Sequence, residues 1–569
     1  MSLTTGINSI DSLVQSSWKT QAGQAVTLTY SFLTRVPTNA STNDANGFLP
    51  MSAVQMEGVR AALDSWAAVA NITFLEVSSN GNIQLGTNNQ GKTSSGYAYL
   101  PDGHDPVALY LNNVENANRS FADGSFGMSV LIHELGHTLG LKHPGDYDST
   151  GGDVQGPFLP TATDNIDYSQ MSYNLGAGFK LNGLYGITPM LYDIQAIQYL
   201  YGANMSYHTG ADTYSFVRDS ALQAIWDAGD TDTFDFSAIA GATVINLNAG
   251  SFSSTAPGYN NISIAYNVTI ENAIASRGGS IIYGNGAGNV IAGGAGNDVV
   301  HQGGGSDQIS GNGGVDTVVF VNKLADYQFD GTLRALNVTG EGADLLSNIT
   351  KLQFSDTTVQ LSNYASLVVG TTGKDVFAGA AGNQFIAGGA DIDTLVLSGK
   401  ASSYKLSTSG SAVFISDVIG NGGTDLMTGV ERLTFSDSSM ALDTLGAAGS
   451  IYRLYSVFNR GPDSLGMGFW IEKTDQGASI TSIASGFVNS PEFNRTYGAD
   501  VTNTVFLTAL YNNVLHRTPD AAGLHSWENL MASGASRADV MVGFTDSAEN
   551  IGVMASIIGV GIAYTPYLG

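Results

Sequence analysis

Hydrophobic positions along the first 220 residues follow helical and strand-like periods in turn. Residues 51–70 place Val59, Leu63 and Trp66 at helical spacing behind Ser52, a residue type that favours helix N-caps. Four short strand-like runs and two further helical patterns follow, at 72–77, 82–87, 96–101, 107–113, 127–141 and 189–202. A helix, several strands and then two helices predict an α+β domain over residues 1–220.

A glycine-rich repeat of nine residues governs the middle of the chain. It runs through residues 284–319, and a second, less regular array covers residues 370–396. Short repeats of this kind bury a continuous core only when they stack on one another. The pattern therefore predicts two β-rich modules, at 221–320 and 321–445.

Residues 446–569 return to helical spacing and contain a duplication. Eight residues recur 57 positions later: Arg460, Pro462, Asp463, Gly466, Trp470, Phe487, Ser490 and Glu492 match Arg517, Pro519, Asp520, Gly523, Trp527, Phe544, Ser547 and Glu549. This predicts an all-α domain built from two related units. Its two tryptophans are either core residues, the more common role, or exposed platforms for a ligand.

Composition narrows the function. The net charge is -27 and only 22 residues are Lys or Arg, which argues against nucleic-acid binding through a basic face. The absence of cysteine excludes disulfides, thiolate metal sites and cysteine nucleophiles. No uncharged apolar run reaches the length of about 20 residues that a transmembrane helix needs. The acids favour Asp over Glu, which suits turns and calcium loops.

The sequence HELGHTLGLKH, which begins at His133, carries the candidate chemistry. His133 and His137 are four residues apart, so both side chains project from one face of a helix. Gly140 lets the chain turn out of that helix, and His143 can return as a third ligand. Three histidines and a water form an open, catalytic type of zinc site. Glu134 can then accept a proton from the activated water and pass it to a leaving amine.

Together with MSY at 171–173, this motif resembles the metzincin zinc endopeptidases of the serralysin type. The resemblance implies that Met171 forms an apolar floor beneath the histidines. It also implies that Tyr173 coordinates zinc in the free enzyme and then stabilises the oxyanion. GYAYLP at 96–101 resembles the edge strand of these enzymes, so an extended peptide is expected to bind along Tyr97, Ala98 and Tyr99.

The repeat GGxGxDxUx resembles the RTX calcium β-roll, and this resemblance implies several structural calcium ions between turn n and turn n+2. Two expected sites are the pairs Asp298 with Asp316 and Asp375 with Asp393. Asp307 faces Asn289, which weakens that pair, and Gln384 has no expected acidic partner. WDAGDTDTFDF at 226–236 resembles a family calcium loop, which adds Asp227, Gly229 and Asp232. A glycine-rich β solenoid without calcium is the alternative.

These features predict a secreted zinc endopeptidase that needs one catalytic zinc and several structural calcium ions, and that acts on proteins or peptides. Proteins with such repeats leave bacteria by type I secretion, which fits the lack of a basic, apolar N-terminal signal. The alternative function is a calcium-dependent surface-associated binding or structural protein that retains a metalloprotease fold. The duplicated region resembles an uncharacterised helical domain of secreted RTX proteins, and a cell-surface layer or glycan is its expected partner.

Overall fold

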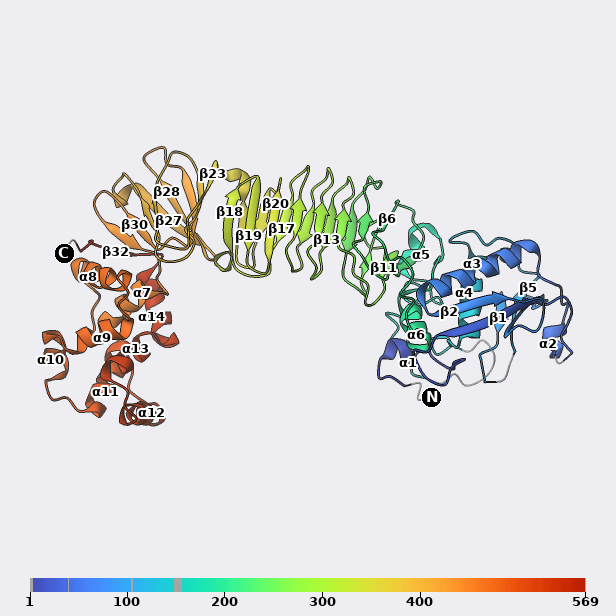
Figure 1. Cartoon of the computed structure of the whole chain (residues 1–569). Helices are drawn as coiled ribbons and strands as arrows, with labels where there is room; N and C mark the ends of the chain where they lie inside the picture. Colours follow the sequence, from blue (N-terminus) through green and yellow to red (C-terminus); the bar gives the residue numbers. More distant parts are fainter. Residues whose placement is uncertain (1–3, 39, 104–105, 148–155, 568–569) are drawn as a thin grey trace. The chain divides into compact units, whose positions relative to one another are not determined.

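The computed structural model describes residues 4–38, 40–103, 106–147 and 156–567 (Figure 1). Two compact units make up the chain, 1–319 with 341–351 and 320–340 with 352–569. The bounds of the four predicted domains stay predictions. Among the described residues, no helix is long and apolar enough to cross a membrane.

The first unit opens with a five-stranded sheet in the order β2-β1-β3-β5-β4. Its strands pair in parallel except β4, which runs antiparallel to β5 at the edge of the sheet. Helices α3 and α4 contact this sheet and each other. The elements are α1 (Asn8–Asp11), β1 (Val26–Phe32), α2 (Thr42–Ala45), α3 (Ala53–Val69), β2 (Ile72–Glu76), β3 (Ile83–Asn88), β4 (Gly96–Ala98), β5 (Val107–Asn112), α4 (Phe126–Leu139), α5 (Ala177–Asn182) and α6 (Leu191–Tyr201).

The predicted elements of this part are confirmed, with small shifts of their ends. Ser52 caps α3 through its hydroxyl, which accepts a hydrogen bond from the Gln55 main-chain N–H. Val59 and Trp66 are fully buried, as their spacing indicated. The helix expected from residue 189 begins only at Leu191, because the chain at Met190 is still extended.

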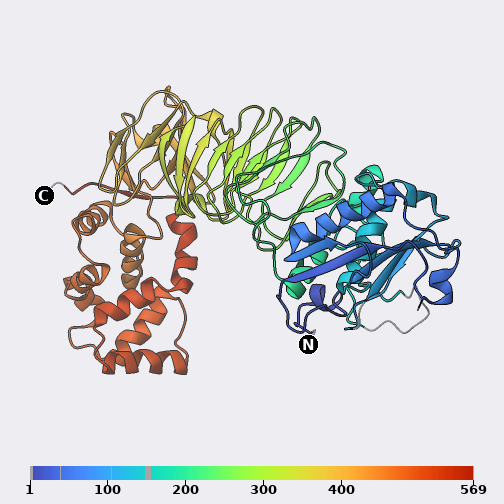
Figure 2. The ribbon, with the colours of Figure 1, turned by 45° about the vertical axis from the view of Figure 1, so that its right-hand side comes forward.

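The glycine-rich repeats fold into a parallel β-roll. Each strand pairs with the strand two turns later, so that Ile291 lies beside Ile309 in one sheet and Val300 beside Val318 in the other. All four side chains are buried between the two sheets, which Figure 2 shows as stacked strands. The strands of this part are β6 (Thr213–Ser215), β7 (Gln223–Ile225), β8 (Thr233–Asp235), β9 (Thr243–Asn246), β10 (Phe252–Ser253), β11 (Ile262–Ile264), β12 (Asn272–Ile274), β13 (Ser280–Tyr283), β14 (Val290–Ala292), β15 (Val299–His301), β16 (Gln308–Ser310), β17 (Thr317–Val319) and β20 (Ala343–Ser347).

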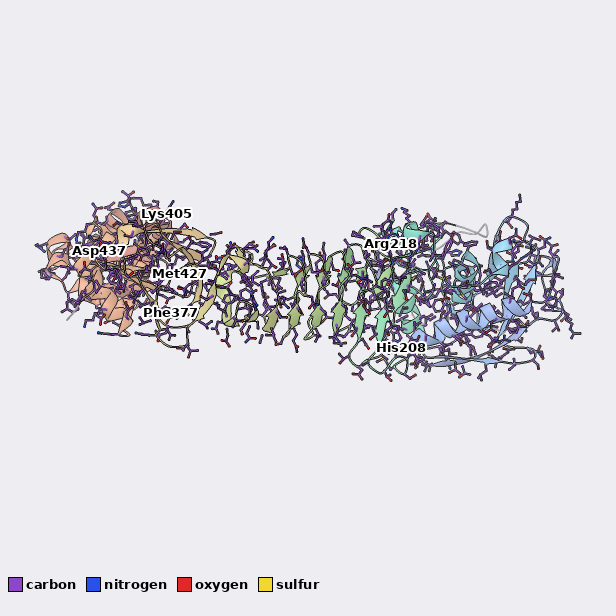
Figure 3. All side chains as sticks on the ribbon, turned by 90° about the horizontal axis from the view of Figure 1, so that it is seen from above. His208, Arg218, Phe377, Lys405, Met427 and Asp437 are labelled. Carbon is purple, nitrogen blue, oxygen red and sulfur yellow. The ribbon has the colours of Figure 1, made fainter. Side chains whose placement is uncertain are left out.

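The second unit contains the other β module. Its core includes Ile386, Leu395 and Met427, and Phe377 packs against them (Figure 3). The strands are β18 (Gln328–Thr332), β19 (Ala335–Thr339), β21 (Lys351–Gln353), β22 (Thr358–Gln360), β23 (Ser366–Val369), β24 (Val376–Ala378), β25 (Gln384–Ala387), β26 (Thr394–Val396), β27 (Tyr404–Ser409), β28 (Ala412–Asp417), β29 (Thr424–Thr428), β30 (Arg432–Thr434) and β31 (Ser439–Ala441).

The remainder of this unit is the predicted helical region. Its helices are α7 (Ala447–Leu454), α8 (Ser464–Asp475), α9 (Ile480–Val488), α10 (Pro491–Tyr497), α11 (Asn503–Val514), α12 (Ala521–Ala532), α13 (Arg537–Thr545) and α14 (Ala548–Ile558). Trp470 packs on Phe487 and Trp527 on Phe544, at ring-centroid distances of 5.5 and 4.7 Å. Both tryptophans are partly buried and pack against the core of the helical region, the more common of the two predicted roles.

The helical region does not end as a helix. After α14 the chain forms a short strand, β32 (Ile562–Tyr564), which pairs antiparallel with β31. Two buried arginines form ion pairs in this unit. Arg432 of β30 binds Asp443 and Asp475 at 2.5 and 2.7 Å, and Arg453 of α7 binds Asp546 at 2.7 Å.

Replacing a core residue of the roll tests its two-sheet packing. We expect Ile291→Ala to lower the free energy of unfolding of the roll by about 2–5 kcal/mol, because it leaves a cavity in a packed core. The neighbouring Val290 is 48% exposed on the other face of the same strand. Val290→Ala should therefore cost no more than about 0.5 kcal/mol. Urea denaturation followed by the β-sheet circular dichroism signal measures both, and equal losses would contradict the packing.

Candidate functional site

Helix α4 supplies the centre of the candidate site. It starts after Ser125, whose hydroxyl accepts a hydrogen bond from the Met128 main-chain N–H, and it ends at Gly140. Gly140 has a left-handed φ of 110°, and a Cβ there would lie 2.2 Å from the Ser16 carbonyl oxygen. Only glycine fits this turn, which brings the chain back toward the helix at His143.

The three predicted histidines converge. The Nε2 atom of His143 lies 3.1 Å from Nε2 of His133 and 3.1 Å from Nε2 of His137. On the far side of each ring, Nδ1–H of His133 donates to the Gln170 carbonyl at 2.8 Å, and Nδ1–H of His137 donates to the Leu141 carbonyl at 2.7 Å. Since a carbonyl can only accept, these bonds leave the Nε2 lone pairs directed at one point.

This arrangement fits a divalent metal ion. Burial lowers the pKa of His133 to about 4 and that of His137 well below its usual value, so both rings are neutral, the form that binds metal. Nitrogens about 2.0–2.1 Å from one tetrahedral zinc lie about 3.3–3.4 Å apart. The observed nitrogen separations are close to that value, and the three histidines could therefore hold zinc.

Met171, which the resemblance makes the floor of the site, packs against the helix that carries His133 and His137, and its role stays a prediction. Met171 is fully buried. Its Sδ atom lies so close to Gly136 that a Cβ added to this glycine would be only 2.6 Å from the sulfur. Gly136 lies in α4 between His133 and His137. The buried carboxylate of Asp193 holds the loop that carries Met171. Asp193 accepts hydrogen bonds from the main-chain N–H of Gln170 at 2.6 Å and from the Ser169 hydroxyl at 2.6 Å.

Glu134 adds a buried carboxyl group beside the metal site. It is only 6% exposed, its Oε2 has no hydrogen-bond partner among the described residues, and burial raises its pKa to about 8. Its Oε1 lies close to Gly96, because a Cβ added to that glycine would be 3.3 Å from the oxygen. The carboxyl group therefore lies against the edge strand β4, where a bound peptide is expected.

Strand β4 presents an open main-chain edge. The Tyr99 main-chain N–H donates to the Ala108 carbonyl on β5. Because hydrogen-bonding groups alternate along a strand, the main-chain N–H and C=O of Ala98 point away from β5. The hydroxyls of Tyr97 and Tyr99 both donate to Asp44, at 2.7 and 3.0 Å, and this fixes the strand from one side. The predicted substrate strand is thus an edge strand, and its role stays a prediction.

Tyr173 is half-exposed and close to the histidines. Its ring lies 4.5 Å from that of His143 and 5.7 Å from that of His133. Tyr147 stacks on it at 4.9 Å, and the Tyr147 hydroxyl donates to Asp164 at 3.0 Å and accepts from the Tyr173 main-chain N–H at 3.3 Å. The predicted zinc-facing tyrosine is therefore held beside the site by a second tyrosine.

Comparison with known proteins indicates the same family as the sequence motifs. Residues 192–437 match the family described as Peptidase M10 serralysin C terminal. Serralysin C of Dickeya chrysanthemi is 40% identical over 284 residues, which cover 46% of this chain and 59% of that protein. Nearly half of this chain is homologous to serralysin. It spans about three fifths of the length of the curated relatives it matches.

Two other relatives show the same extent of likeness to this serralysin homologue. Metalloprotease AprA of Pseudomonas entomophila (strain L48) is 36% identical over 286 residues, which cover 46% of this chain and 59% of that protein. Serralysin of Proteus mirabilis is 37% identical over 310 residues, which cover 48% and 62%. Residues 484–554 match a domain of unknown function, DUF4214. A crystal structure of the extracellular lipase LipA from Serratia marcescens is 15% identical over 27% of this chain and 38% of that chain, with a TM-score of 0.11, too low to indicate a shared fold.

The predicted calcium residues of the roll form a regular series of contacts in this serralysin homologue. In four of the five repeat acids, one carboxylate oxygen accepts a hydrogen bond from the main-chain N–H of the residue 18 positions earlier. The bonds run to Asp298 from Ser280, to Asp307 from Asn289, to Asp316 from Asp298 and to Asp393 from Asp375, at 2.6 to 2.9 Å. The carboxylate of the fifth, Asp375, accepts from the Thr371 main-chain N–H. Among the described residues, the second oxygen of Asp307, Asp316 and Asp393 is buried without a hydrogen-bond partner, as suits a ligand of a cation.

One expectation about this series is wrong. Gln384 does have an acidic neighbour, because Asp425 accepts a hydrogen bond from its main-chain N–H at 2.7 Å. The partner comes from 41 positions later, since the antiparallel strands β27 and β28 interrupt the repeat. Asp344 and Glu431 extend the series in the same way, at 3.0 and 2.9 Å from the main-chain N–H of Asp307 and Asp393.

The predicted loop at 226–236 lies at the first turn of the roll. Asp227 accepts hydrogen bonds from the Gly229 main-chain N–H and the Tyr214 hydroxyl, at 2.9 and 2.6 Å. Burial, together with the charge of Asp227, raises the pKa of Asp232 to about 7. The structure adds Asp212, whose main-chain N–H donates to Asp232 at 2.8 Å.

His208, labelled in Figure 3, lies within 4.8 Å of the Asp212 and Asp227 ligand atoms. The sequence motifs did not reveal His208 or Asp212. Gln170 and Leu141 also escaped sequence reasoning, because they act through main-chain carbonyls that any residue supplies. Asp193 could have been found from the sequence, since an acid in the first turn of a helix is a common capping residue.

Removing the carboxylate of Asp193 tests its support of the metal site. We expect Asp193→Asn to weaken zinc binding roughly tenfold, the lower end of the effect of losing an outer support of a metal ligand. Asparagine has nearly the same volume as aspartate. Its NH₂ group, however, would face donors that already point at the carboxylate, so a hydrogen bond would be lost. Asp219→Asn, at an exposed position, is the control. Zinc competition titration measures both, and unchanged affinity in Asp193→Asn would rule the support out.

The metal-free roll should lose stability as the pH rises. Burial raises the pKa of Asp307 to about 7 and that of Asp316 to about 6, above the value of about 3.9 for an unfolded aspartate. Their contribution is therefore present below about pH 4 and is lost as the pH rises through 6 to 7. Without metal, we expect a lower melting temperature at pH 8 than at pH 5. Thermal melting measures this, and Asp307→Asn should reduce the difference while Asp219→Asn preserves it.

Proposed function

We propose that this protein is a secreted zinc-dependent endopeptidase that hydrolyses peptide bonds in proteins. One observation carries the proposal: three histidine Nε2 atoms converge, and the buried carboxyl group of Glu134, next in sequence to His133, lies against the edge strand β4. The arrangement suits substrates that add to the sheet as an extended strand. Recognition through the main chain would then give broad specificity.

Each residue of the site has a separate proposed role. His133, His137 and His143 hold zinc, which supplies Lewis acidity for the scissile carbonyl and lowers the pKa of water. Glu134 accepts the proton of the attacking water and returns it to the leaving amine. Positive charge beside a buried carboxyl group lowers its pKa, so Glu134 is ionised when the site is loaded. The hydroxyl of Tyr173 stabilises the oxyanion.

Calcium completes the proposal. The buried second oxygens of Asp307, Asp316 and Asp393 support structural calcium ions in both β modules, since calcium takes six to eight oxygen ligands. Binding would then contribute to folding outside the cell, where calcium is plentiful. We propose type I export from a bacterium, and a cell-surface or glycan partner for the helical region.

Replacing the proposed base tests the enzyme. We expect Glu134→Ala to lower kcat by about 10²–10⁴-fold, the usual range for loss of a general base, with zinc content unchanged. Glu57→Ala, at an exposed position of α3, is the matched control. Cleavage of a quenched peptide library and zinc analysis on the same preparation measure both quantities.

If the zinc-loaded protein and Glu134→Ala gave equal cleavage, the endopeptidase proposal would fail. The second candidate would then stand, a calcium-dependent surface-associated protein that retains a metalloprotease fold. The helical region and the second β module favour it, because hydrolysis at α4 does not require them.

A further inference from the structure

A small cavity lies between the two copies of the duplicated helical unit. Its volume is about 180 Å³, and its lining comes from the end of α7 and the turn after it, from the end of α11, and from α14. Asn459 of the first copy and His516 of the second both border it. These residues are 57 positions apart and each precedes the repeated arginine. Equivalent loops of the two copies therefore meet at one cavity.

The two loops have the same conformation and the same anchor. Asn459 and His516 are left-handed, with φ of 53° and 52°, which is uncommon for residues other than glycine. Arg460 then pairs with Glu492 at 2.8 Å, and Arg517 pairs with Glu549 at 2.7 Å. An ion pair at the next residue therefore anchors each of the two loops that carry Asn459 and His516.

The lining combines polar and apolar residues. Asn459, Asn513 and His516 supply amide and imidazole groups, which can both donate and accept hydrogen bonds. Nδ2 of Asn513 donates to the Val457 carbonyl at 2.9 Å, which fixes the orientation of its amide. Met554 and Ile557 of α14 add apolar surface to the lining.

Charge and size restrict the ligand. Among the described residues that line the cavity, Arg460 is the side chain with a permanent charge, and both oxygens of Glu492 bind it at 2.8 Å. An anion would therefore find its charge already neutralised. The volume is below the range of about 300–1,000 Å³ that suits drug-sized ligands, so a single small ring fits best. A pyranose has this character: hydroxyls around its rim and an apolar C–H face.

We propose that this cavity binds a neutral sugar ring. Its C–H face would pack on Met554 and Ile557, and its hydroxyls would bond to Asn459, Asn513 and His516. The ligand is the neutral sugar of a glycan, so this inference rests on the glycan partner proposed above for the helical region and is independent of the proposed peptide hydrolysis.

Gly461 provides a way to close the cavity. A Cβ at this residue would lie 3.5 Å from the Tyr452 hydroxyl, an ordinary contact, so a larger side chain can enter the cavity without disturbing the backbone. The matched control is Thr518→Leu, at the equivalent exposed position of the second copy, outside this cavity. Glucose, galactose, N-acetylglucosamine and the anionic N-acetylneuraminic acid are the probes, measured with the full chain by saturation-transfer NMR.

We expect at least one neutral sugar to bind with millimolar affinity, at least tenfold more weakly in Gly461→Leu and unchanged in Thr518→Leu. Absence of binding by every neutral sugar, equal binding in Gly461→Leu, or preference for the anionic sugar would each overturn the proposal. If Gly461→Leu lost its helical circular dichroism signal, Ile557→Glu, at a position 61% exposed, would replace it and should weaken binding to the same extent.

Discussion

The metal centre of this serralysin homologue depends on one buried carboxylate. Asp193 is fully buried at the start of α6 and accepts the main-chain N–H of Gln170, whose carbonyl in turn orients the ring of His133. The same loop places Met171 against the helix that carries the histidines. A charge buried this deeply is tolerated only because it is fully hydrogen-bonded. The orientation of the metal-binding histidines therefore depends on buried residues outside the HELGHTLGLKH motif.

The sequence was informative where chemistry needs particular side chains. The spacing of His133 and His137, the glycine turn and His143 determined the candidate site, because a helix converts spacing into a shared face. The supports of these ligands were invisible, since Gln170 and Leu141 contribute only carbonyl oxygens. Main-chain groups leave no signature in a sequence, and their positions follow from tertiary packing.

The same limit applies to the β modules. A period of nine residues predicted stacked strands and the buried aliphatic positions, because each turn repeats the same environment. Where the hairpin of β27 and β28 interrupts the repeat, the period no longer shows which acid faces which turn, and Asp425 was missed. A regular repeat predicts which residues of neighbouring turns are partners. An inserted hairpin separates two partners in the sequence although they still lie side by side in the fold.

The strand β32 has a consequence for the order in which the second unit can form. Its partner β31 ends at Ala441, and the whole helical region lies between them. Closing such a long loop costs chain entropy, which rises with the logarithm of its length. The pairing becomes favourable once the helices have folded and brought the two ends together. The sheet edge at β31 is therefore covered last, so it remains an open template for pairing until then.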